Sequence, residues 1–116
     1  MAKILVHVTC GPEQPTKAAL AFLVAKAAID DGHEVSLFLA GDGVQLLRDA
    51  TLDAVQGVGT GSLRESFDAV VAGGAAIYAS GMSSQAREVP LEGKAEPAMP
   101  KRLVELVLEH DRVLSY

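Results

Sequence analysis

The chain has 116 residues, of which 49% are hydrophobic and 22% charged, and these values predict one globular domain, residues 1–116, and exclude a disordered protein. The 15 acidic and 10 basic residues give a net charge of −5, so nucleic acid and anionic membrane surfaces are not expected as partners. The chain has a single cysteine, which excludes an internal disulfide and a thiolate metal site, and we expect neither a metal nor a cofactor.

The first half of the chain predicts two strands, each followed by a helix. A β-branched run near the start is typical of a strand that is covered on both faces. Pro12 and Pro15 suit the first turn of the helix that follows, and Gly32 ends that helix. The elements are expected at residues 4–9 (strand), 16–31 (helix), 34–39 (strand) and 44–50 (helix).

The second half continues this alternation after a glycine-rich loop at residues 56–61. Ser62 and Glu65 have the spacing of a capping box, which predicts the start of a helix. Gly73 and Gly74 end that helix. Helices are expected at residues 63–72, 81–88 and 101–110, and strands at residues 75–79, 94–96 and 112–115.

Alternating strands and helices predict the α/β class: a flavodoxin-like parallel sheet of four to five strands with helices on both faces. Ligands of such sheets bind beyond the carboxyl ends of the strands. If the first and third strands are neighbours, Cys10 and Ser80 face each other across one crevice there. The loops at these ends are Thr9-Cys10-Gly11, Gly41-Asp42-Gly43 and Ser80-Gly81-Met82.

The cysteine, Cys10, has two interpretations. It follows a strand and precedes a helix, whose amino-terminal partial charge can lower the pKa of a thiol. On this interpretation the thiol opens into the crevice beside Ser80 and has a pKa below that of a free thiol. The alternative is a small buried hydrophobe, and Pro12 and Pro15 weaken the first interpretation because they remove two backbone donors from that turn. No His, Asp or Glu is placed by the sequence as a partner base for Cys10.

Two charged residues near these loops are also open to two interpretations. Asp42 can contact a ligand or can cap the helix that follows it. Arg87 can present its guanidinium to an anion, or it can form a surface salt bridge, for instance with Glu88 or Glu92. His7 lies inside the first strand and is interpreted as a core histidine.

The predicted helix at residues 16–31 also bears on quaternary structure. Residues 18–29 are almost all apolar, with Lys26 as the only charge. A helix that is apolar nearly all round is buried on more than one side. In so small a domain, the second side is expected to meet another copy of the chain.

The amino terminus shows no signal peptide, since Met1-Ala2-Lys3 leads directly into the first strand. The longest uncharged stretch, residues 69–86, contains glycines, serines and a glutamine and is too polar to span a bilayer. We therefore expect a cytoplasmic protein.

The order and spacing of several segments resemble the DsrE/DsrF-like family, from Lys3 to Tyr116. The segments are Thr9-Cys10-Gly11-Pro12-Glu13, Gly32-His33-Glu34-Val35, Leu37-Phe38-Leu39-Ala40-Gly41-Asp42-Gly43, Ile77-Tyr78-Ala79-Ser80-Gly81, Ala86-Arg87 and Asp111-Arg112-Val113-Leu114-Ser115-Tyr116. The resemblance implies a small flavodoxin-like domain that forms homotrimers or hexamers. Some members of this family relay sulfur as a persulfide on a cysteine.

The same resemblance places that carrier cysteine at Ser80, and it places a family glycine at Glu88. A serine hydroxyl cannot hold a persulfide, so the relay mechanism is not expected at Ser80. Cys10 stands where many relatives of this family have histidine, and it is the one residue able to carry sulfur.

Three functions therefore remain open. The first is a binding domain for a small ligand, with polar contacts from Thr9, Gly11, Gly41, Asp42, Gly43, Ser80, Gly81, Met82 and Arg87. The second is a thiol-handling protein that carries a persulfide on Cys10 and passes it to the thiol of a protein partner. The third is a structural subunit of an oligomeric assembly.

Overall fold

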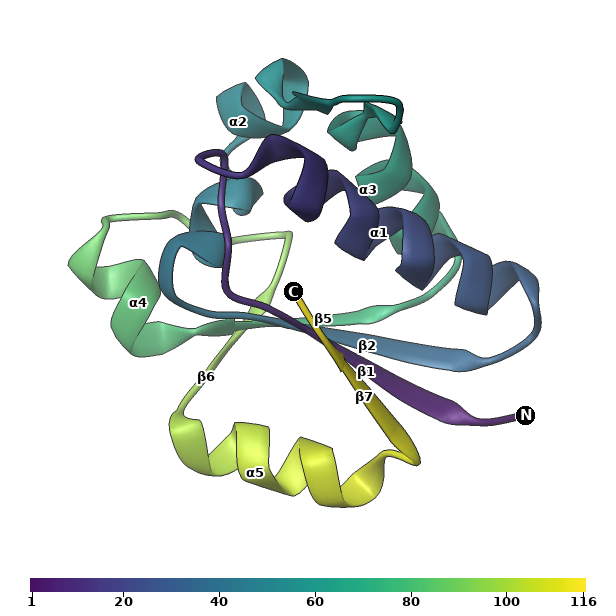
Figure 1. Cartoon of the computed structure of the whole chain (residues 1–116). Coiled ribbons are helices and arrows are strands. Elements are labelled where there is room, and N and C mark those ends of the chain that lie inside the picture. The colour runs from purple at the N-terminus through teal and green to yellow at the C-terminus, as the bar shows by residue number, and fades with distance from the viewer.

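A parallel sheet forms the centre of the computed structural model, which describes residues 1–116 (Figure 1). Its five strands have the order β6-β5-β2-β1-β7, and every neighbouring pair is parallel. The strands are β1 (Lys3–Val8), β2 (Glu34–Leu39), β5 (Ala76–Ser80), β6 (Glu96–Ala98) and β7 (Arg112–Ser115). A short antiparallel ribbon of β3 (Gln56–Gly57) and β4 (Gly61–Ser62) lies apart from this sheet. The predicted α/β fold is confirmed.

Helices cover both faces of the sheet, as predicted. One face carries α1 (Pro15–Asp30) and α3 (Leu63–Ala72), and the other carries α5 (Pro100–Glu109) (Figure 1). The main core lies under α1 and α3, where the rings of Phe22 and Phe67 are 5.8 Å apart. A smaller core under α5 consists of Leu5, Phe38, Ala98 and Leu106. Three shorter helices complete the fold: the 3₁₀ helix η1 (Gly41–Leu47), α2 (Asp49–Ala54) and α4 (Gly81–Ala86).

The strand order differs from the expected flavodoxin-like arrangement. The first and third strands of the sheet, β1 and β5, are not neighbours, because β2 lies between them. β2 suits this central place because Val35, Leu37, Phe38 and Leu39 are apolar, as expected of a strand that is covered on both faces. The expectation that Cys10 and Ser80 end adjacent strands is therefore wrong.

Several element boundaries also differ from the predicted ones. The helix predicted at residues 44–50 is divided into η1 and α2 by Arg48, whose backbone is extended (φ −74°, ψ 133°). The helix predicted at residues 81–88 ends at Ala86, because Glu88 has a positive φ of 54°. The strand predicted at residues 94–96 begins two residues later, as β6 (Glu96–Ala98). Lys94 and Ala95 are instead part of a turn, in which their backbone N–H groups donate to Leu91 O.

The last strand pairs with the first, which brings the two ends of the chain together. β7 pairs with β1, and beyond the pair Tyr116 N donates to His7 O at 2.9 Å. Thr9 donates to Tyr116 O twice, from its backbone N at 2.9 Å and from Oγ1 at 3.0 Å. The other edge strand, β6, contains Pro97, which cannot donate to a further strand.

An exposed apolar stripe lies on α5, whereas the sequence predicted one on α1. α3 packs along α1, so that α1 exposes little apolar surface beyond Leu20. On α5, the exposed fractions are 59% for Val104, 41% for Val107 and 80% for Leu108. These residues are spaced at i, i+3 and i+4, which places them on one side of the helix. None of the helices combines the length and the apolar character that a membrane crossing requires.

Candidate functional site

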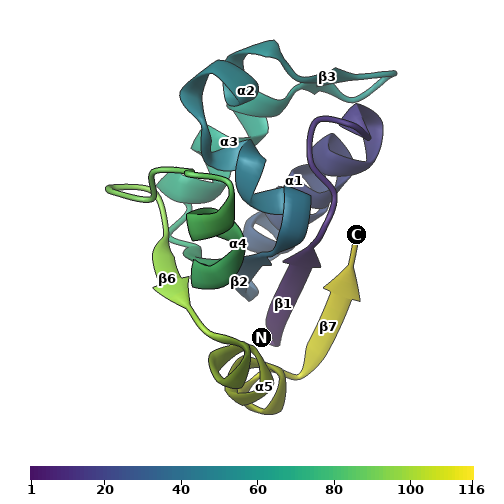
Figure 2. The same ribbon diagram turned by 90° about the vertical axis from the view of Figure 1, so that its left-hand side faces the viewer.

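A polar cluster joins the loop after β2 to the helix after β5, at the carboxyl ends of both strands. Ser80 ends β5, and its Oγ accepts a hydrogen bond from Ser83 N at 3.1 Å, which caps α4. Ser83 Oγ in turn accepts from Gly41 N at 2.9 Å. Figure 2 shows α4 beside the blue segment that follows β2. The two serine hydroxyls thus hold the loop against α4.

Arg87 completes this carboxyl-edge cluster from the end of α4. Its Nε donates to Asp42 Oδ1 at 3.1 Å, and its Nη1 donates to Ser83 O at 3.3 Å. Arg48 Nη2 donates to Arg87 O at 2.6 Å, which fixes the backbone there. The ion-pair partner of Arg87 is therefore Asp42, and not Glu88 or Glu92 as the sequence suggested. Asp42 does not act as a side-chain cap of η1.

Glycines let the loops after β1 and β2 approach each other closely. A side chain at Gly43 would overlap the carbonyl oxygen of Val8, and one at Gly11 would overlap that of Asp42. Gly11 N donates to both carboxylate oxygens of Glu13, at 2.9 and 3.0 Å. These two glycines, predicted as ligand contacts, thus bring backbone segments together.

Cys10 lies in the main core and is 4% exposed. Burial raises the pKa of its thiol, although nearby Lys17 acts in the opposite direction. The prediction of an accessible thiol with a lowered pKa is therefore wrong. Gly43 lets η1 approach the backbone at the end of β1 closely, and Cys10 belongs to the same buried cluster as the apolar residues of η1.

The other predicted site residues are distributed along the same edge. Gly41, Asp42, Ser80 and Arg87 belong to the cluster, and Gly81 begins α4 close to Met99. Met82 is 59% exposed. The hydroxyl of Thr9 donates to Tyr116 O, on the side of β1 that faces β7.

Sequence reasoning did not predict the roles of Ser83 and Arg48 in the cluster. Ser83 had a local signal, because it follows Ser80 by three residues, which is the spacing of a capping bond. Arg48 had none, because its bond to Arg87 O spans 39 residues.

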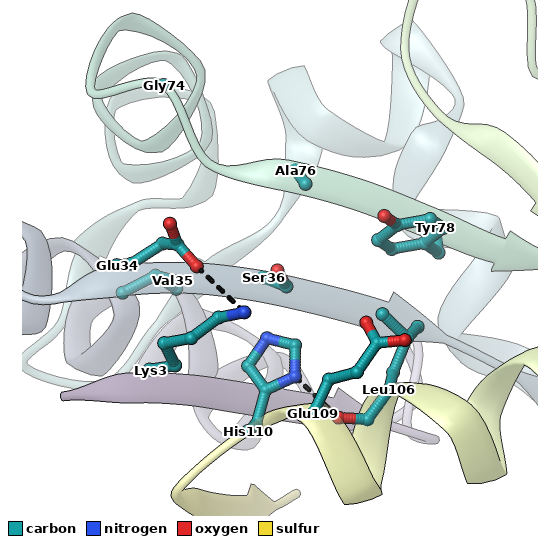
Figure 3. A pocket seen from close by; sticks show the side chains of 10 residues that line it. All are labelled: Lys3, Glu34, Val35, Ser36, Gly74, Ala76, Tyr78, Leu106, Glu109 and His110. Carbon is teal, nitrogen blue, oxygen red and sulfur yellow. Dashed lines mark hydrogen bonds and ion pairs between the residues drawn. The ribbon is translucent and has the colours of Figure 1, made fainter.

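The cavities of the molecule lie elsewhere. Neither Cys10 nor Ser80 lines any of the three. An open hollow of about 390 Å³ lies at the start of α1, and a smaller one of about 140 Å³ lies near Thr60. A third, of about 280 Å³, lies between α5 and the amino half of the sheet (Figure 3). None of these cavities therefore lies at the position of the predicted crevice.

His7 faces the smaller core and does not join the carboxyl-edge cluster. Its ring packs edge-on against Phe38, with 5.9 Å between ring centroids. Burial lowers the pKa of His7, and its Nε2 is bonded to no protein group. No three His, Cys, Asp or Glu side chains lie close enough together to hold a metal ion.

A family model described as DsrE/DsrF-like family matches residues 2–116. The ychN protein from E. coli is 20% identical in sequence with a TM-score of 0.82, and the match covers 100% of both chains. A conserved protein of unknown function from Bacteroides thetaiotaomicron is 14% identical with a TM-score of 0.74, over 99% of this chain and 95% of that chain. None of the curated proteins matches. At these identities the structural matches show a shared fold.

Proposed function

The chain belongs to the DsrE/DsrF-like family, and from this premise we propose that it binds a small anionic ligand at the carboxyl-edge cluster. In this proposal Ser80 stands at the position of the family's carrier cysteine, and this member does not relay sulfur there. Ser80 Oγ is instead engaged by Ser83 N. The site is built around the guanidinium of Arg87.

The bonding of Arg87 is the observation that carries this proposal. Nε and Nη1 are held by Asp42 and by Ser83 O, whereas Nη2 has no protein acceptor. A planar guanidinium with a free edge is suited to a carboxylate or phosphate oxygen. The side chains of Arg87 and Asp42 are 31% and 57% exposed. An ion pair that is this exposed to solvent contributes only about 0–1 kcal/mol to stability. A ligand with a better-placed oxyanion can therefore displace Asp42.

Cys10 supports the sulfur-carrier alternative poorly. A persulfide forms on an accessible thiolate, whereas Cys10 is 4% exposed and burial raises its pKa. The anion-binding proposal needs no movement of the core.

The first test measures binding of inorganic phosphate and acetate by NMR titration at constant ionic strength. We expect saturable shifts of the Gly41 and Arg87 resonances. We expect Arg87→Gln to weaken the affinity about tenfold, because it removes a charge-assisted hydrogen bond. Asp42→Asn should strengthen binding, because it removes the competing carboxylate.

Arg112→Gln is the matched control, because Arg112 is an exposed arginine at the amino end of β7, outside the cluster. It removes the same charge. If both arginine variants lost the same affinity for the anions, the loss would be due to net charge alone, and the proposed site would be refuted. Saturation by neither anion would refute the proposal as well.

We also propose that the protein is a homo-oligomer, a trimer or hexamer, that uses the apolar stripe of α5. A contiguous exposed stripe of this kind is typical of protein interfaces. In size-exclusion chromatography with light scattering, we expect the wild type to have a multiple of the 12.1 kDa chain mass. The double variant Val104→Glu/Leu108→Glu should have the chain mass itself, because it places two carboxylates in the interface.

Val58→Glu provides the control for that experiment. Val58 is 89% exposed in the loop between β3 and β4, away from α5. This variant should keep the wild-type mass. A wild-type mass near 12.1 kDa at micromolar concentration would contradict the oligomer.

A further inference from the structure

The cavity under α5 has the features of a second binding site. Its volume is about 280 Å³, and it lies at the amino ends of the strands, at the opposite edge of the sheet from Arg87. Figure 3 shows Lys3, Ser36 and Tyr78 on the sheet side, with Glu109 and His110 on the α5 side. It is thus independent of the carboxyl-edge cluster.

His110 presents a bare acceptor at this cavity. Its Nδ1 is bonded to Leu106 O, and a carbonyl oxygen can only accept, so the ring proton of the neutral imidazole lies on Nδ1. Nε2 is then an acceptor, and it is buried with no protein partner. A buried acceptor without a donor destabilises the fold. A ligand that donates a hydrogen bond to Nε2 removes this cost.

Ser36 adds a second polar group at an unusual position. It lies in β2, the central strand, and is 7% exposed, whereas its neighbours in the strand are apolar. Its hydroxyl makes no hydrogen bond to another protein group and lines the cavity. Because this hydroxyl opens onto the cavity and has no protein partner, Ser36 is also available to a ligand.

The charges around the cavity select the kind of ligand. Lys3 Nζ lies 3.5 Å from Glu34 Oε2, so that this cation is already paired. Glu109 Oε2 accepts from Arg102 at 3.2 Å, and its Oε1 has no partner. Together with His110 Nε2, the free groups are mostly acceptors.

We propose that this cavity binds a small organic cation with a primary ammonium group. The ammonium group has three donors, which match Nε2 of His110, the hydroxyl of Ser36 and the free carboxylate oxygen of Glu109. The short alkyl part of the ligand contacts Leu106 and Ala76, which also line the cavity.

The probe for this proposal is n-butylammonium chloride, titrated at constant ionic strength into the full chain labelled with ¹⁵N and ¹³C. Saturable shifts are expected for the His110 ring nitrogens and for Ser36, but not for Arg87. His110→Phe should weaken the affinity about tenfold or more, because it removes a hydrogen bond to a charged donor. Ser36→Ala, which removes only a hydroxyl, should also weaken it and keeps the test valid should the histidine variant misfold.

Two controls separate this site from general charge effects. Lys101→Gln changes an exposed residue of α5 outside the cavity and should leave the affinity within about twofold of wild type. Potassium chloride and sodium butyrate should not shift His110. Absence of saturation, equal shifts with potassium, or wild-type affinity in Ser36→Ala would each overturn the proposal. Because Arg87 is not involved, these outcomes leave the anion site untouched.

Discussion

Cys10 is expected to react with iodoacetamide roughly 100-fold more slowly in the native protein than in the unfolded chain, because modification requires local opening of the core. Cys10 is 4% exposed, and burial raises the pKa of its thiol, so both access and thiolate fraction are reduced. As pH rises, the native rate should increase through a midpoint above that of an ordinary thiol. The sign follows from the raised pKa, since the folded state holds the thiol proton to higher pH than the unfolded chain does.

The rate is measured by intact mass over time in buffer and in denaturant. The same measurement after incubation with a persulfide donor tests sulfur transfer. The native protein should gain no sulfur, and Cys10→Ser should behave as wild type does. Rapid native alkylation together with added sulfur on Cys10 would overturn this expectation, and the sulfur-carrier alternative would then replace anion binding as the proposed function.

Gly43→Ala is expected to lower the free energy of unfolding by about 3 kcal/mol, the upper end of the usual overpacking cost. The new methyl group would overlap the carbonyl oxygen of Val8, and backbone cannot rotate away as a side chain does. The loops after β1 and β2 must therefore separate. Urea unfolding monitored by circular dichroism measures the loss.

Gly81→Ala is the matched control at the same edge of the sheet. There the new methyl group would lie 3.7 Å from Met99 Sδ, an ordinary contact distance. We expect a change below about 1 kcal/mol. If both variants lost equal stability, the close approach at Gly43 would not be the cause. The Gly43 variant should also expose Cys10 to alkylation, which links the two measurements.

Local patterns were sufficient to predict most of the elements. The bond from Glu65 N to Ser62 Oγ, at 3.4 Å, begins α3 where the capping spacing placed it. The helix at Pro15 and the strand at Glu34 also begin within a residue of expectation. These signals involve residues only a few positions apart, and a sequence displays them directly.

The sheet order and the burial of Cys10 depend on distant segments. β1 pairs with β7, and beside this pairing Lys3 N donates to Asp111 Oδ2, across 108 residues. Nothing near Cys10 in the sequence indicates that it packs into the main core. A helix start beside a cysteine favoured reactivity, and the tertiary contact reversed that inference.

In the candidate sites, too, the sequence indicated individual residues but not the contacts between distant ones. Asp42 and Arg87 were chosen from loop positions, but their pairing spans 45 residues and became evident only in the fold. The cavity under α5 was not predicted at all, because Lys3, Ser36 and His110 come from three separate elements or their ends.

The pairing of β7 with β1 has a consequence for synthesis on the ribosome. The edge of β1 facing β7 stays open until residues 112–115 have left the exit tunnel. Lys3 O and His7 O, which accept from Asp111 N and Tyr116 N in the finished fold, have no partner until then. An apolar strand edge of this kind can pair with other nascent chains. The sheet is therefore completed only after the whole domain has been translated, and this final pairing closes a very long loop.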